Sequence, residues 1–76
     1  MIYGTKLIET DSELFAAALA QSPVLVWSFD HMGVYFQVDS GTIVKYTSEQ
    51  IVIRSEALPH QMKCYSRETS EVSLRP

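Results

Sequence analysis

Short apolar runs at strand spacing alternate with polar turns along most of this 76-residue chain. The segment 24–29 (VLVWSF) is apolar at five of six positions, which is typical of a strand buried on both faces. The segments 34–38 and 50–55 instead alternate between two faces, with Ile51 and Ile53 on one side. We predict strands in six segments: 1–8, 24–29, 34–38, 42–47, 50–55 and 61–66.

Turn residues and a proline set the expected strand boundaries. The tetrapeptide 30–33 (DHMG) and the tripeptide 39–41 (DSG) each combine aspartate with glycine, so we predict a turn at both. Pro59 cannot donate a backbone hydrogen bond and interrupts the pattern. After it, 61–66 is expected to be an edge strand with Cys64 facing inward as a small buried side chain.

One helix is predicted from about Asp11 to Gln21. Thr10 and Glu13 have the spacing of a capping box, in which each side chain binds the other residue's backbone amide. Four apolar residues at spacings of three and four then predict the buried stripe, and Pro23 ends the helix. The stripe consists of Leu14, Phe15, Ala18 and Leu19.

The element order predicts an α+β fold. It reads β-α-β followed by an antiparallel meander, with one helix packed on one face of a five- to six-stranded sheet. Residues 1–66 are expected to form a single domain. The polar segment 67–76 is expected to fray or to add a short edge strand.

A single helix of this length is too small to cover the predicted sheet. It is about 16 Å long and about 10 Å wide, whereas five strands span about 24 Å. Aromatic residues fall on both faces of the strands in any register, and leaving them in water would cost several kcal/mol. Two solutions remain open: the meander curls into a half-barrel that covers itself, or the uncovered face packs against another chain.

Composition removes several classes of protein. The net charge of −3 gives no field that would attract phosphate, so nucleic acid is not the expected partner. Cys64 is the only cysteine, which excludes a disulfide within the chain. No apolar run reaches the roughly 20 residues of a membrane span. The apolar stretch 14–20 follows acidic residues, unlike a signal peptide, and we therefore expect a cytoplasmic protein.

No residue pattern carries a recognised catalytic or metal-binding motif. Asp30 and His31 in one predicted turn, with Asp39 in the next, are the candidate ligand-binding residues. Their spacing matches no metal motif, so we expect neither a metal nor a cofactor. A nucleophilic role for Cys64 with His60 beside it is weaker than a packing role. Aromatic strand residues can also stack RNA bases, but the six cations are scattered and outnumbered.

The surplus of apolar strand surface is the strongest functional indication. We predict a small non-catalytic protein-interaction module that acts through its sheet face, as a homodimer or with another protein. The alternative is a small ligand-binding protein or enzyme with a pocket at a dimer interface, using Asp30, His31 and Asp39. Aromatic residues dominate interface energetics, and four are the expected anchors: Trp27, Phe29, Tyr35 and Tyr46.

Overall fold

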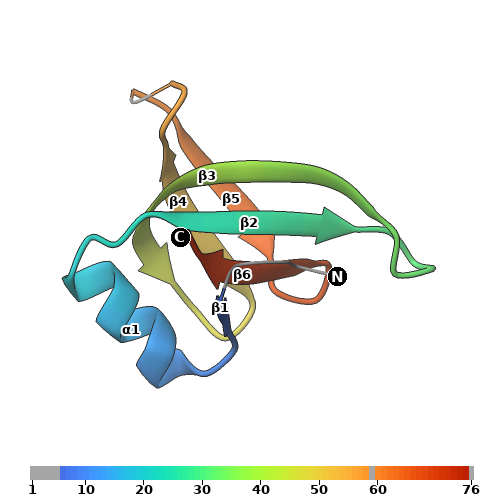
Figure 1. Cartoon of the computed structure of the whole chain (residues 1–76), viewed down its shortest axis with the longest axis horizontal. Helices are drawn as coiled ribbons and strands as arrows, with labels where there is room; N and C mark the ends of the chain where they lie inside the picture. Colours follow the sequence, from blue (N-terminus) through green and yellow to red (C-terminus); the bar gives the residue numbers. More distant parts are fainter. Residues whose placement is uncertain (1–5, 59, 76) are drawn as a thin grey trace.

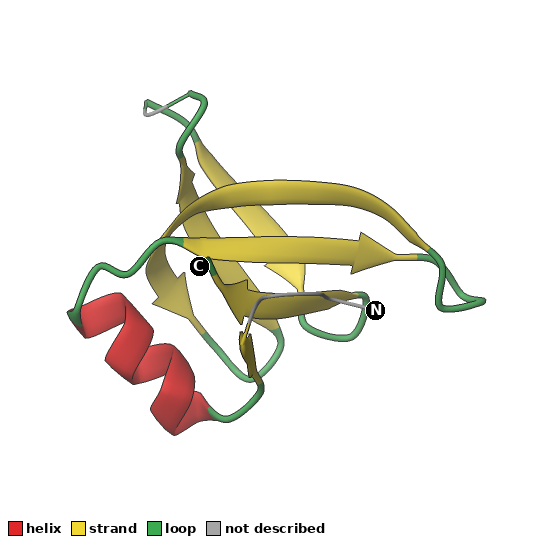
Figure 2. Ribbon diagram, in the orientation of Figure 1, coloured by secondary structure: helices red, strands yellow, loops and turns green. Residues whose placement is uncertain are grey.

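The computed structural model describes residues 6–58 and 60–75 as one helix and six strands (Figures 1 and 2). Most of the predicted first strand, 1–5, lies outside the described residues. The elements in chain order are β1 (Lys6–Ile8), α1 (Asp11–Leu19), β2 (Val24–Phe29), β3 (Tyr35–Tyr46), β4 (Gln50–Ser55), β5 (Met62–Ser66) and β6 (Ser70–Leu74).

The six strands form one antiparallel sheet in the order β1-β6-β2-β3-β4-β5, which confirms the α+β prediction. The meander from β2 to β5 is as expected, and β5 lies at an edge. β6 is an interior strand between β1 and β2, although a frayed tail or an edge strand was expected for this segment. β1 and β2 therefore run parallel to each other on either side of β6, joined through α1.

β3 is one long strand, and the turn predicted at 39–41 is absent. Its first half pairs with β2 and its second half with β4, and Gly41 lies opposite both Val24 and Ser55. A Cβ atom at Gly41 would collide with the carbonyl oxygen of Arg54, so this close approach requires glycine. A register shift between Ile43 and Lys45 adds a bulge just beyond it. The predicted turn residues instead mark the place where the strand changes partners.

The sheet folds over on its inner face. Tyr65 of β5 pairs with Ile51 of β4, and Ile51 pairs with Tyr46 of β3. Tyr46 lies seven residues along β3 from Asp39. That offset corresponds to about 23 Å in a flat sheet, yet the Tyr65 hydroxyl donates a hydrogen bond to the Asp39 carboxylate. The two halves of the sheet therefore face each other, which corresponds to the curled sheet, one of the two solutions that the sequence left open.

α1 begins as predicted and ends in a different way. Thr10 Oγ1 accepts from the Glu13 amide at 3.2 Å, and Glu13 Oε1 accepts from the Thr10 amide at 3.2 Å, which confirms the capping box. At the other end Gln21 has a φ of 52°, and the Ser22 amide donates to the Ala17 carbonyl. This is a Schellman ending with glutamine in the left-handed position that usually holds glycine.

The predicted apolar stripe of α1 was partly wrong. Leu14 and Ala17 are buried, while Phe15 and Leu19 are 56% and 74% exposed. α1 packs against β3, and the side of the helix that carries Leu14 and Ala17 is turned toward the core while Phe15 and Leu19 are turned toward solvent.

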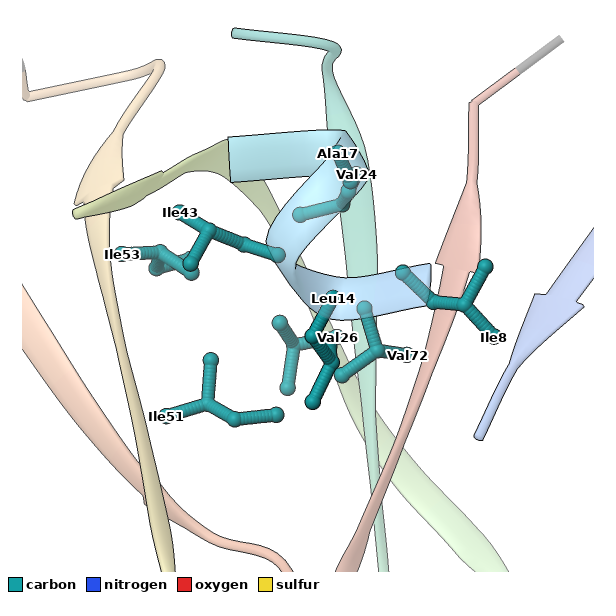
Figure 3. Packing of buried hydrophobic residues seen from close by; sticks show 9 residues of the cluster. All are labelled: Ile8, Leu14, Ala17, Val24, Val26, Ile43, Ile51, Ile53 and Val72. Carbon is teal, nitrogen blue, oxygen red and sulfur yellow. The ribbon is translucent and has the colours of Figure 1, made fainter. Parts of the chain in front are cut away.

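Nine buried residues from the helix and five strands form the core (Figure 3). β2 contributes Val24 and Val26, while its alternate residues Leu25, Trp27 and Phe29 are only half-buried. The prediction that this strand is buried on both faces is therefore right for one face only. The core residues are Ile8, Leu14, Ala17, Val24, Val26, Ile43, Ile51, Ile53 and Val72.

Candidate functional site

The half-buried residues of β2 form an aromatic cluster on the face that points away from the core. Strand alternation places Trp27 and Phe29 on this side because Val26 and Ser28 point inward and are buried. A register shift near the end of β2 brings Tyr35 opposite Phe29. The Tyr35 ring packs edge-on against both neighbours, with centroids 5.8 Å from Trp27 and 6.1 Å from Phe29.

Hydrogen bonds to β6 fix the polar ends of this cluster. Trp27 Nε1 donates to Ser73 Oγ at 2.9 Å, and the Tyr35 hydroxyl donates to Glu71 Oε2 at 2.9 Å. The bond to Glu71 raises the pKa of the Tyr35 phenol above its ordinary value. Ser73 is fully buried, so Trp27 supplies the partner that its hydroxyl needs. The rings are held in one arrangement without a ligand.

The apolar surface continues from this cluster along β3 to the hairpin that joins β2 and β3. Val38 lies opposite Trp27 and is 48% exposed. Phe36, Val34 and Met32 are 67%, 56% and 77% exposed. We define the outer face as the surface carrying six residues: Trp27, Phe29, Val34, Tyr35, Phe36 and Val38.

The structure brings together three of the four aromatic anchors chosen from the sequence. Trp27, Phe29 and Tyr35 are mutual neighbours on the outer face. Tyr46 lies at the far end of β3 and packs against the core, so it is not part of that surface. Tyr35 and Tyr46 were predicted on two short neighbouring strands, but they lie at opposite ends of the long β3.

The three candidate ligand-binding residues do not meet. Asp30 closes the hairpin turn, because its carboxylate accepts the amides of Met32 and Val34 at 2.9 and 3.0 Å. His31 is exposed in the same turn. Asp39 points inward from the middle of β3, opposite Val26, about 13 Å along the strand from Asp30.

Asp39 belongs instead to an inner polar cluster that the sequence did not indicate. Its carboxylate accepts from the Tyr65 hydroxyl, accepts from Gln37 Nε2 at 2.8 Å, and lies 3.5 Å from Lys63 Nζ. The Tyr65 bond is the main cause of the lowered pKa of Asp39, and burial with the same bond raises the pKa of Tyr65. Both pKa values move away from neutrality, so neither group is suited to proton transfer near pH 7.

The expected inward position of Cys64 was wrong, and this is why the polar cluster was missed. Cys64 is exposed, and its neighbours Lys63 and Tyr65 point inward. The reason is pairing: Ile51 and Ile53 face the core, and their partners across the ladder are Tyr65 and Lys63. Register between strands decides this orientation, and the alternation within 61–66 carries no information about it.

One hollow lies between α1 and the start of β6, with a volume of about 260 Å³. Its lining includes Leu14, Phe29 and Arg67, but none of Asp30, His31 and Asp39. Arg67 Nη1 is already bound to Asp11 Oδ1 at 2.8 Å and to the Thr47 carbonyl at 2.7 Å. Three other hollows at the surface measure about 340, 370 and 430 Å³, and none of them is lined by Asp30, His31 or Asp39.

Over residues 6–58 and 60–75, no three of the histidine, cysteine, aspartate and glutamate side chains gather as a metal site would require. Within the same residues, no helix is long and apolar enough to cross a membrane.

Family models, curated proteins and solved structures give no match to this chain. The class is therefore defined by architecture: a small α+β domain whose six-stranded antiparallel sheet folds over a core closed by one helix. The exposed aromatic surface lies on the opposite side of that sheet from the core.

Proposed function

We propose that this domain is a non-catalytic protein-interaction module that contacts its partner through the outer face. The supporting observation is the pinned cluster of Trp27, Phe29 and Tyr35, with exposed Val38 and Phe36 beside it. Tryptophan and tyrosine are enriched among residues that dominate binding energy. Rings already held in place lose little conformational freedom when a partner binds.

A ligand pocket using Asp30, His31 and Asp39 has weaker support. The carboxylates of Asp30 and Asp39 are both committed to intramolecular hydrogen bonds. Binding a ligand there would require these bonds to break, at a net cost of about 1 kcal/mol for each bond.

The proposal includes a cytoplasmic location. The thiol of Cys64 is exposed, and a reducing compartment keeps such a thiol from forming disulfides between chains.

The proposal is tested by comparing two substitutions that each remove one exposed or half-exposed apolar side chain. Tyr35→Ala alters the outer face, and Leu19→Ala alters the helix surface, where Leu19 is 74% exposed. Each folded variant is immobilised and used to capture proteins, including added copies of this chain, with quantitative mass spectrometry as the readout. We expect Tyr35→Ala to lose at least tenfold of the specific capture, a change of about 1.4 kcal/mol, and Leu19→Ala to retain it.

Trp27 is the only tryptophan and supplies a direct second readout. A captured partner should shield the indole from acrylamide quenching and shift its emission to shorter wavelength. Equal capture by both variants, or binding that leaves Trp27 as accessible as before, would contradict the proposal.

A further inference from the structure

The first half of β3 has one side without a strand partner. Residues Tyr35–Gly41 pair with β2, but pairing with β4 begins only at Gly41. Among the described residues, no strand pairs with the other side of the segment from Tyr35 to Asp39. In Figure 1 this hairpin of β2 and β3 projects to the right, away from β4 and β5.

Backbone groups on that side are positioned to accept another strand. The Ser40 carbonyl points toward β4, since it accepts from the Glu56 amide at 2.9 Å. Successive residues of a strand direct their backbone groups to opposite sides, so the amide and carbonyl of Val38 face the same open side as those of Ser40. An exposed edge of this kind is a template for strand addition.

The segment lacks the charges that usually protect such an edge. Residues 34–38 (VYFQV) contain no charged residue and no proline. The adjacent Asp39 points inward and is paired with Lys63 and Tyr65. Among residues 6–58 and 60–75, ten large apolar residues are exposed and four of them lie within 32–38, so exposed apolar surface is concentrated at this edge.

We infer that a second copy of this chain pairs antiparallel with the open side of β3, joining two sheets through Val38 and its neighbours. A second copy presents the same uncharged edge, so pairing two copies brings no like charges together, and a two-fold contact of this kind uses the same surface on both copies. The inference goes beyond the proposed function, because it names a partner for the strand edge that borders the outer face. A contact through one strand edge falls in the smallest size class of specific interfaces, so we expect dimerisation in the micromolar range.

The test is the mass of the purified chain by sedimentation equilibrium from about 1 to about 200 µM, a range that brackets the expected constant. The unmodified chain should change from monomer to dimer across this range. Val38→Pro removes the outward amide, while the amides that pair with β2 remain. It should stay folded by circular dichroism and weaken dimerisation at least tenfold. Val38→Ala keeps the amide and should weaken it less than Val38→Pro does.

If Val38→Pro unfolds the chain, Val38→Lys replaces it, since two copies would then place like charges at the pairing edge. Loss of the dimer in this folded variant supports the inference. A chain that remains monomeric at 200 µM overturns the inference, while capture of another protein through Tyr35 would still support the proposed function. A dimer that survives Val38→Pro or Val38→Lys but is lost in Tyr35→Ala also overturns edge pairing and leaves the outer face as the contact.

Discussion

At the scale of single residues, the inner polar cluster connects the two halves of the folded sheet through side-chain hydrogen bonds and an ion pair. Tyr65 of β5 and Asp39 of β3 lie far apart in register, and their hydrogen bond holds the folded-over arrangement. Lys63 and Gln37 complete the partners of the Asp39 carboxylate. This cluster therefore contributes to stability, and its effect should depend on pH.

The pKa of Asp39 is lowered in the folded state, mainly by the Tyr65 hydroxyl. A carboxylate with a lowered pKa stabilises the fold at pH values above its unfolded pKa of about 3.9, and this contribution disappears as the pH falls. We expect Asp39→Asn to be less stable than the unmodified chain at pH 7, and the difference to shrink below about pH 4. Urea denaturation at pH 7 and pH 3 measures both quantities.

Glu68→Gln is the matched control, because it removes an exposed carboxylate from the turn between β5 and β6. Tyr65→Phe, which removes only the donor, should cost about 1 kcal/mol at pH 7. An Asp39→Asn deficit of the same size at both pH values would show that the carboxylate charge has no part in this contact.

At the scale of elements, β3 determines the shape of the molecule. The sequence divided it into two strands because Asp39, Ser40 and Gly41 have the composition of a turn. In the structure the strand continues, and Gly41 permits its backbone to approach Arg54 so closely that the sheet can bend there. The composition of residues 39–41 indicated a change in backbone direction, which we predicted as a turn. Only the pairing of β3 with β4 shows that it is a bend within one strand.

Gly41→Ala should destabilise the domain by about 3 kcal/mol, because the added methyl group would collide with the rigid backbone carbonyl of Arg54. Gly33→Ala is the control. Gly33 has a φ of 80° but has open space around its Cβ position, so the cost there is about 1 kcal/mol of backbone strain. Thermal and urea unfolding compare the two. Similar losses at both glycines would mean that the bend accommodates a side chain.

The helix shows how far local signals extend. Thr10 and Glu13 specify its start completely, since a capping box involves only residues three apart. Its buried face was harder to predict, because the helix carries two pairs of apolar residues that could each face the core. One pair is Leu14 and Ala17, and the other is Phe15 and Leu19. Packing against β3 and the core buries the first pair and leaves the second pair exposed.

At the scale of the whole molecule, Arg67 links the parts that enclose the core. Its Nη1 contacts Asp11 at the start of α1 and the carbonyl of Thr47 in the turn after β3. Its own amide donates to the Glu49 carbonyl in the same turn. From the turn between β5 and β6, Arg67 thus connects the start of α1 with the turn between β3 and β4.

Arg67→Lys should cost about 1 kcal/mol, because the shorter lysine side chain does not bring its ammonium group to the position of Nη1, which donates to both acceptors. Amide hydrogen exchange in α1 should accelerate as the helix loosens. Arg75→Lys is the control: Arg75 pairs with Glu56 at a site where both side chains are nearly half exposed, and it should cost less than about 0.5 kcal/mol. Equal losses in the two variants would contradict a special role for Arg67.

The sequence by itself determined the α+β class, the helix start, the meander order and an excess of apolar strand surface. These follow from residue spacing and from local hydrogen bonds, which depend on neighbours in the chain. Tertiary structure alone decided that β3 is continuous, that β6 lies between β1 and β2, and that Lys63 and Tyr65 point inward. Such features depend on register between distant strands, because a shift of one residue exchanges the two faces of a strand. For the same reason the sequence indicated an uncovered apolar surface, and the fold located it on the outer face around Trp27.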